Sequence, residues 1–499
     1  VITALARELR RAGVIRRHSG SEVWFVAADE LDFLPPAPGV QWFATRQLAG
    51  LGPGLAELAR AIALLGAEFD ADMVEAVTRV AEAGVRIDPA VGLEQLAGSG
   101  VVVAQGATWR FRSEAEQDAI ADTVPAPVAR AIHAAALAHA RARADDAATW
   151  AQVAFHAARA GDGATAVVAA ERLAADAQAR HAPLEAERWL TLALDQLGDG
   201  PAAARQRLLG QRGRTRRLLT HYEAAQADLR AARELALAAD DHADAIDLQV
   251  ADGAVCDYTQ RLGESARLIE EAAATAPPDL PVQVRAHLDN WLGVVRARQE
   301  RLPEAQALLT AAIDAAERQG DHATAIGSML MLGGVLRRLG LPRDGLAVLD
   351  RAIALCDQVG DHFHLTYGLF NRVNIWRQLD RPAEATADAE RAIAVANRMG
   401  FDQIELWGWY DLSLLRFWAG DLAGALAASE ASHKIGSERF REAPPVVASV
   451  WYALLLAVAG EVPAARRQLE HLRVDDLGDN PFLTLTRDLA ALACADDVA

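Results

Sequence analysis

Small residues recur every 40 positions through more than half of this chain, and this period constrains the fold more than any other feature. One series consists of Ala225, Ser265, Ala305, Gly345, Ala385, Ala425 and Ala465. A second series lies twelve residues earlier, at Gly213, Gly253, Gly293, Gly333, Val373, Ser413 and Ala453, and only Val373 is not small. Two antiparallel helices approach closely only where neither carries a bulky side chain at the crossing. The period therefore predicts a helical solenoid, in which each repeat packs only against its neighbours.

One copy of the repeat resembles a known motif. The segment with Leu292-Gly293, Ala305 and Ala312 resembles the tetratricopeptide repeat (TPR), which has Leu-Gly, Ala and Ala at these offsets. The resemblance implies a right-handed α-solenoid, a class of fold that binds partners and rarely does chemistry. We expect about seven repeats of 40 residues over 204–473, followed by a helical cap over 474–499.

The turns between the expected helices follow the same period. Gly320-Asp321 and Gly360-Asp361 lie 40 residues apart, with Gly suited to end one helix and Asp to cap the next. Three Asp-His pairs fall at equivalent turns: Asp241-His242, Asp321-His322 and Asp361-His362. Equivalent turns of stacked repeats should lie about 10 Å apart, one helix-packing distance. We therefore interpret these pairs as helix caps and expect no metal site.

The N-terminal part has a different pattern. Residues 1–40 combine an amphipathic helix from Ile2 to Ala12, a strand-like run from Glu22 to Val26 and a Pro-rich break. Over 41–125, helical patterns near 55–66, 71–83 and 90–98 precede two strand-like runs, 101–104 and 108–111. Three helices and a hairpin indicate a winged-helix-like domain. Residues 126–203 are expected to form a helical bridge, so the whole chain is predicted to be predominantly all-α.

Several segments carry a resemblance to one family. Leu64–Phe69, Leu93–Leu96, Phe111-Arg112, Ile132–Ala136 and Phe155–Gly161 resemble the region that follows the ATPase core in bacterial STAND ATPases, the signal-transduction ATPases with numerous domains. Many relatives carry this block behind a serine/threonine kinase domain. The resemblance implies that residues 1–40 end the lid region of an ATPase and that ATP or ADP binds upstream. Because the chain begins with Val1 in a helical pattern, we expect it to be a fragment.

The resemblance has one departure at the hairpin. Relatives typically have His after Phe-Arg, whereas this chain has Ser113. A serine cannot reproduce the charge switch of a histidine. Nucleotide sensing is therefore not expected at this position.

Composition excludes several classes of function. Lys434 is the only lysine and lies in no phosphate-binding loop or kinase motif, and no Gly-x-Ser-x-Gly motif occurs. We therefore expect no catalytic residues, no metal and no cofactor in this segment. A net charge of −18 argues against nucleic-acid binding, as does the absence of Arg and Lys from 88–96, the expected recognition helix.

Other features concern the compartment and the surface. Three widely spaced cysteines, Cys256, Cys356 and Cys494, fit a reducing cytoplasm, and no apolar run is long enough to cross a bilayer. His133 and His139 are interpreted as structural. A basic stripe is interpreted as a solvated face that pairs with neighbouring acids: Arg205, Arg207, Arg212, Arg214, Arg216 and Arg217.

These observations favour a regulatory segment that binds a protein or small ligand in the TPR groove and controls an upstream ATPase or kinase. The alternatives are a TPR-containing transcriptional regulator, which a mobility-shift assay would reveal, and a free-standing TPR scaffold.

The offsets of groove residues in the TPR give a candidate binding site. Aromatic side chains and Arg are enriched at binding hot spots. The site consists of His287, Asn290, Arg337, Tyr367, Phe370, Asn374, Arg377, Trp407, Tyr410 and Phe417. We interpret Trp409 and Trp418 instead as core between repeats. Replacing Tyr367, Arg377 or Trp407 by Ala should weaken binding by about 1–3 kcal/mol.

Overall fold

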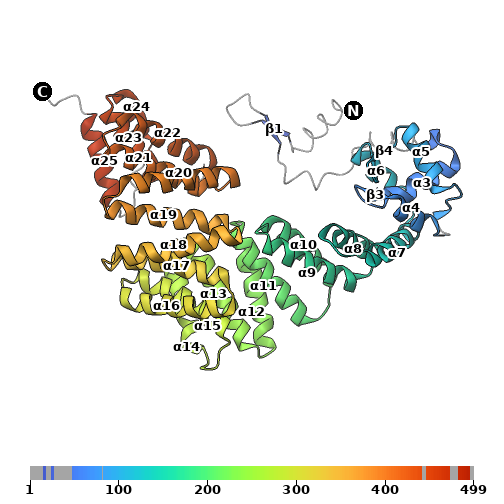
Figure 1. The fold of residues 1–499 in the computed structure, drawn as a ribbon, viewed down its shortest axis with the longest axis horizontal. Coiled ribbons are helices and arrows are strands. Elements are labelled where there is room, and N and C mark those ends of the chain that lie inside the picture. Colours follow the sequence, from blue (N-terminus) through green and yellow to red (C-terminus); the bar gives the residue numbers. More distant parts are fainter. Residues whose placement is uncertain are drawn as a thin grey trace. The chain divides into compact units, whose positions relative to one another are not determined.

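The computed structural model describes residues 15–17, 24–26, 48–80, 83–440, 446–471 and 481–494. These residues are mostly helical, with two small sheets (Figure 1). The predicted fold class is therefore confirmed. The chain divides into two compact units, Val1–His221 and Tyr222–Ala499. The expected helix from Ile2 to Ala12 and the expected boundaries at residues 40 and 473 lie outside the described residues, and the boundaries at 125 and 203 stay predictions.

The N-terminal unit contains the three helices and the hairpin that the sequence predicted. The helices are α3 (Pro53–Ala63), α4 (Ala71–Thr78) and α5 (Pro89–Gly98). Strands β4 (Val102–Gln105) and β5 (Thr108–Phe111) pair antiparallel. A third strand that the sequence did not indicate, β3 (Phe69–Asp70), pairs with β5. The order is compatible with a winged helix, which stays a prediction.

The remaining strands and helices of this unit follow the same local rules. Strand β1 (Ile15–Arg17) pairs with β2 (Trp24–Val26), which confirms the strand-like run there. The helices after the hairpin are α6 (Glu114–Ala121), α7 (Ala126–Ala142), α8 (Ala147–Ala160), α9 (Gly163–Ala179), α10 (Pro183–Leu197) and α11 (Ala202–Leu218). Consecutive helices from α7 to α11 pack against each other.

The C-terminal unit consists of helices that alternate between two positions in the repeat (green to red in Figure 1). We call one set the first helices: α13 (His242–Tyr258), α15 (Val282–Arg298), α17 (His322–Arg338), α19 (His362–Gln378), α21 (Asp402–Trp418) and α23 (Val446–Val458). The second helices are α12 (Tyr222–Ala238), α14 (Leu262–Thr275), α16 (Leu302–Gln319), α18 (Pro342–Val359), α20 (Pro382–Met399), α22 (Leu422–Arg439) and α24 (Val462–Glu470). Helix α25 (Pro481–Ala493) packs on α23 and α24.

The small residues lie where the two helices of a repeat cross. A Cβ atom added to Gly333 would lie 2.6 Å from Leu349 Cγ, and one added to Gly293 would lie 2.8 Å from Leu309 Cγ. In the series that lies on the second helices, Ala305 and Ala425 are 0% exposed. At a later crossing, the Ser413 hydroxyl donates to the Ala425 carbonyl at 2.8 Å. The predicted role of the 40-residue register is thus confirmed.

The turns at the helix ends recur every 20 residues, which is half of the 40-residue period. Residues with positive φ recur at multiples of 20 and include Gly320 (φ 69°) and Gly360 (φ 76°). In other copies a residue other than Gly occupies this left-handed position: Thr220, Asp240, Gln260, Glu300 and Asp380. The side chains of Asp241, Asp321 and Asp361 accept hydrogen bonds from backbone N–H groups three residues ahead. The expected capping role of these aspartates is confirmed.

The first helices lie closer together than the second helices. Each first helix from α13 to α19 contacts the first helix of the next repeat, whereas successive second helices between α12 and α22 make few such contacts or none. Helices packed more closely on one side of a stack curve the stack toward that side. The first-helix face of the C-terminal unit is therefore its concave side.

Candidate functional site

All ten residues predicted to bind a partner lie on four first helices, α15, α17, α19 and α21. The structure does not join them into one site. They form three groups, which differ in whether their polar atoms already have partners within the fold.

The first group, His287 and Asn290, is engaged in contacts between repeats. His287 Nδ1 lies 2.5 Å from Asp247 Oδ1 on the preceding first helix. Asn290 is 7% exposed, and its side-chain oxygen accepts a hydrogen bond of 2.9 Å from the Ser328 hydroxyl. These polar atoms connect neighbouring repeats, so they offer little to a ligand.

The second group is centred on two arginines, Arg337 on α17 and Arg377 on α19. Arg337 is half-buried, and within the described part of the chain no hydrogen bond or ion pair satisfies its guanidinium. Burial, followed by the positive charges of Arg338 and Arg377, lowers the pKa of Arg337. Arg338 is different, because it is paired with Glu300. A desolvated arginine without a counter-charge is uncommon in a folded protein.

Arg377 has partners, but not all of its hydrogen-bond donors are satisfied. Its Nη1 lies 3.3 Å from Asp411 Oδ1, which is long for a charge-assisted hydrogen bond. Neither Arg377 Nε nor Asp411 Oδ2 has a partner among the described residues. The guanidinium also lies over the Trp418 ring, 4.5 Å from its centroid. Burial raises the pKa of Asp411 to about 7, although Arg377 acts to lower it.

Three neighbours on α19 complete this group. The Asn374 side chain donates to the Phe370 carbonyl at 3.1 Å, and its oxygen lies 3.4 Å from Arg377 Nη1. Tyr367 packs against Phe363, with the ring centroids 5.1 Å apart. Burial, followed by the proximity of Tyr258 and Tyr222, raises the pKa of Tyr367 to about 12. We call Arg337, Phe370, Asn374, Arg377, Asp411 and Trp418 the arginine cluster.

The third group is aromatic and mostly packed inside the fold. Tyr410 is 9% exposed and contacts Trp407 and Trp451 edge-on. Phe417 also contacts Trp451, with the ring centroids 5.4 Å apart. Trp451 donates its indole N–H to the Ser413 hydroxyl at 2.9 Å. These aromatic residues mainly hold α21 against α23.

One of the two tryptophans assigned to the core was assigned wrongly. Trp409 packs against a core cluster around Val373 and Ala389, as expected. Trp418 is instead 58% exposed. It is the last residue of α21, where the turn begins, and the Arg377 guanidinium lies over its ring.

Asp411 was not among the residues predicted from the sequence. This residue is an acid within the largely apolar run of α21, and it is only 4% exposed. An isolated acid in such a run is a signal that could have identified it, because carboxylates are rarely buried without a partner.

The other candidates from the sequence have structural roles. Ser113 accepts a hydrogen bond from the Glu116 N–H and thereby caps α6. His133 is buried, with its Nδ1 3.0 Å from Nδ1 of His156, and burial lowers the pKa of His133 to about 4 and that of His156 to about 3. In the basic stripe, Arg207 pairs with Glu171 and Arg216 with Glu187.

Within the described ranges, no three potential metal ligands lie together as a group. No helix of these ranges is long and apolar enough to span a membrane. All three cysteines are free thiols.

The fold and the site together define a TPR-like α-solenoid with two neighbouring arginines, Arg337 and Arg377, on successive first helices. No family model and no curated protein sequence matches this chain. Among solved structures, the chain is similar to a STAND protein with a tetratricopeptide repeat sensor from Pyrococcus horikoshii, with 10% identity and a TM-score of 0.53. The match covers 91% of this chain and 67% of the other, and it establishes similarity of fold.

Two further similar structures match less well. A Rap protein complexed with competence and sporulation factor has 12% identity and a TM-score of 0.44, over 70% of this chain and 99% of the other. The Rap conjugation gene regulator of plasmid pLS20, in complex with the Phr* peptide, has 12% identity and a TM-score of 0.46. The match covers 77% of this chain and 97% of the other. These TM-scores are too low for any argument about this chain.

Proposed function

We propose that the C-terminal unit binds an acidic segment of a protein partner on its concave first-helix face, and that this binding controls a STAND-type ATPase core upstream. One observation carries the proposal: Arg337 is half-buried, has no counter-charge within the described part of the chain, and lies beside a second arginine, Arg377. In a chain of net charge −18, such a patch is complementary to carboxylates.

The other members of the arginine cluster suit the same role. Asn374 offers an amide next to Arg377, and Trp418 offers an exposed ring surface at the end of the same face. Arginine and tryptophan are the residues most often found at binding hot spots. An anionic side chain that reached Arg337 would supply the counter-charge that the fold itself does not provide.

The regulatory part of the proposal draws on the resemblance to STAND ATPases and on the fold shared with the Pyrococcus protein, whose repeats are described as a sensor. In this mechanism, a bound partner favours one of two arrangements of the full-length protein. Deleting 222–499 from the full-length protein should change its basal ATP hydrolysis. Unchanged hydrolysis and an unchanged response to the partner would contradict this part.

Selection from a random peptide library tests the binding part directly. We expect the selected peptides to be enriched in Asp and Glu, and to lose binding when Arg337 or Arg377 is replaced by Gln. Arg318 at the end of α16 is an exposed arginine without a partner in the described ranges, so Arg318→Gln is a matched control. Selected peptides that are neutral or basic, or that bind Arg337→Gln as well as wild type, would refute the proposal.

A further inference from the structure

A cavity outside the arginine cluster has the features of a second binding site. It lies between α12, α13 and α14 and has a volume of about 390 Å³. Volumes of this size hold small-molecule ligands in other proteins. The cavity is lined by the apolar side chains Leu229, Leu248 and Leu268 and by three arginines, Arg230, Arg233 and Arg267, together with acidic residues.

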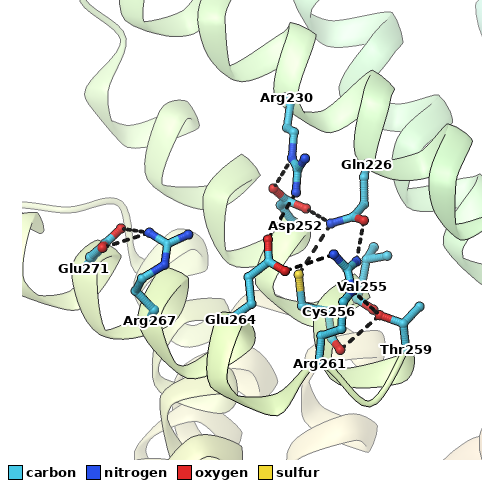
Figure 2. A network of polar contacts seen from close by, with 10 residues as sticks. All are labelled: Gln226, Arg230, Asp252, Val255, Cys256, Thr259, Arg261, Glu264, Arg267 and Glu271. Atoms are coloured by element: carbon cyan, nitrogen blue, oxygen red, sulfur yellow. Dashed lines mark hydrogen bonds and ion pairs between the residues drawn. The ribbon is translucent and has the colours of Figure 1, made fainter.

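Most charges around this cavity are already neutralised by each other. Arg230 Nε donates to Asp252 Oδ2 at 2.8 Å, and Arg261 donates to Glu264 at 2.9 Å. Figure 2 shows these four side chains turned toward one another, with Gln226 joining the network through Asp252. The acids that line this part of the cavity therefore have arginine partners.

Arg267 and Glu271 form a separate pair. They lie one helical turn apart on α14, and Arg267 Nη1 is 2.9 Å from both carboxylate oxygens of Glu271 (Figure 2). Both side chains are more than half exposed, so water screens this pair. Arg267 therefore keeps donors that can face the cavity.

Among the described residues, Arg233 is the half-buried charge of the cavity that has no partner. Its Nε is buried and makes no hydrogen bond, and within the described residues no ion pair reaches its guanidinium. The cavity also borders Glu234, the next residue on α12, but Glu234 is exposed and forms no ion pair with Arg233. The positive charge of Arg233 is thus uncompensated in the wall of the cavity.

The spacing of the repeats explains why Arg233 is isolated. Residues 34 apart on successive second helices pair with opposite charge elsewhere, as in Asp357 with Arg391 at 2.8 Å. The same spacing pairs Arg230 with Glu264 at 3.5 Å. The residue 34 positions after Arg233 is Arg267, which has the same charge. Two guanidinium groups therefore flank the cavity at a position where the fold normally places an acid.

We propose that this cavity binds a small organic anion, a phosphate or carboxylate on an apolar body. The anion lies between Arg233 and Arg267, and the apolar body lies against Leu229, Leu248 and Leu268. Such a ligand supplies the negative charge that the repeat omits, and guanidinium groups bind both anions through paired N–H donors. The limited volume of the cavity favours a small molecule over a protein segment. This site is independent of the one proposed on the concave face.

Calorimetric titration with phenyl phosphate tests the proposal. We expect saturable binding of one molecule per chain, and a loss of affinity of at least about tenfold in both Arg233→Met and Arg267→Met. Methionine keeps an apolar stem while removing the charge. Arg318→Met should bind as wild type does, because it removes an exposed arginine at the end of α16 that has no partner in the described ranges. Inorganic phosphate should bind more weakly than phenyl phosphate, because it lacks the apolar body.

A thermal melt separates loss of binding from loss of folding. Without ligand, Arg233→Met should melt at or above the wild-type temperature, because it removes an unpaired charge. Phenyl phosphate should raise the melting temperature of wild type but not of Arg233→Met. No saturable binding up to about 10 mM, or equal affinity in wild type and Arg233→Met, would overturn the proposal.

Discussion

Asp411 should make the stability of the C-terminal unit depend on pH. Its pKa is raised from 3.8 to about 7, so the folded state keeps a proton that the unfolded state has released. Stability should therefore fall as the pH rises from about 4 to about 7 and level off above that. The pH-dependent contribution of this carboxyl group to stability is absent from Asp411→Asn. We expect the melting temperature of wild type, relative to Asp411→Asn, to decrease between pH 5 and pH 8; a constant difference would contradict the assignment.

The left-handed residues at helix ends provide a second test on single residues. Gln260 has φ of 61° at a position where Gly340 and Gly420 occur in other copies. A side chain in this region costs about 1 kcal/mol or more, which glycine avoids. Gln260→Gly should stabilise the protein by about 0.5–1 kcal/mol in chemical denaturation. Gln260→Ala, which keeps a Cβ, should not; equal effects of the two substitutions would exclude this explanation.

At the scale of the helix pair, two adjacent glycines should respond in opposite directions. A Cβ on Gly333 would lie within 3.1 Å of three Leu349 carbons, whereas a Cβ on Gly334 would meet nothing within 4 Å. Gly333→Ala should therefore destabilise the protein by about 1–3 kcal/mol through overpacking. Gly334→Ala should stabilise it by up to about 1 kcal/mol, because alanine favours the helix. Equal stability changes measured for both variants would disprove the close-packing role of the register.

The helix pair is also the level at which the sequence was most informative. The 40-residue period predicted the crossing at Gly293 and Gly333 because close approach of two helices requires small residues, and this requirement is local. Capping by Asp321 and Asp361 was also predictable, because a helix cap depends on residues that are neighbours in the chain. The short strand β3 was not, because its pairing with β5 connects residues far apart in the chain.

Contacts between repeats could not be derived from the sequence alone. His287 was expected to face a ligand, but it contacts Asp247, which occupies the equivalent position one repeat earlier in the chain. Whether such residues meet depends on how far each repeat is rotated relative to the next, and the period does not fix that rotation. The same uncertainty explains why Trp418 was assigned to the core. Helical periodicity places it on a face, but whether a neighbour covers that face depends on the curvature of the stack.

At the scale of the whole C-terminal unit, two half-buried arginines without partners among the described residues distinguish two surfaces. Arg337 lies in the last turn of the first helix α17, and Arg233 lines a cavity between α12, α13 and α14. Many other arginines of this unit are paired with acids of neighbouring helices, for example Arg351 with Glu317 and Arg372 with Asp388. Arg318 also has no partner in the described ranges, but it is exposed, whereas Arg233 and Arg337 are half-buried. We therefore propose that these two half-buried arginines are neutralised by bound partners.

Calorimetry with an acidic peptide selected on the wild-type unit is the most direct test of the claim that the concave face binds an acidic partner. We predict that Arg337→Gln and Arg377→Gln each weaken binding by at least about tenfold, equivalent to 1.4 kcal/mol, and that raising the salt concentration weakens wild-type binding further. Arg318→Gln should leave the affinity unchanged. Wild-type affinity in both folded Arg337→Gln and folded Arg377→Gln would contradict the claim.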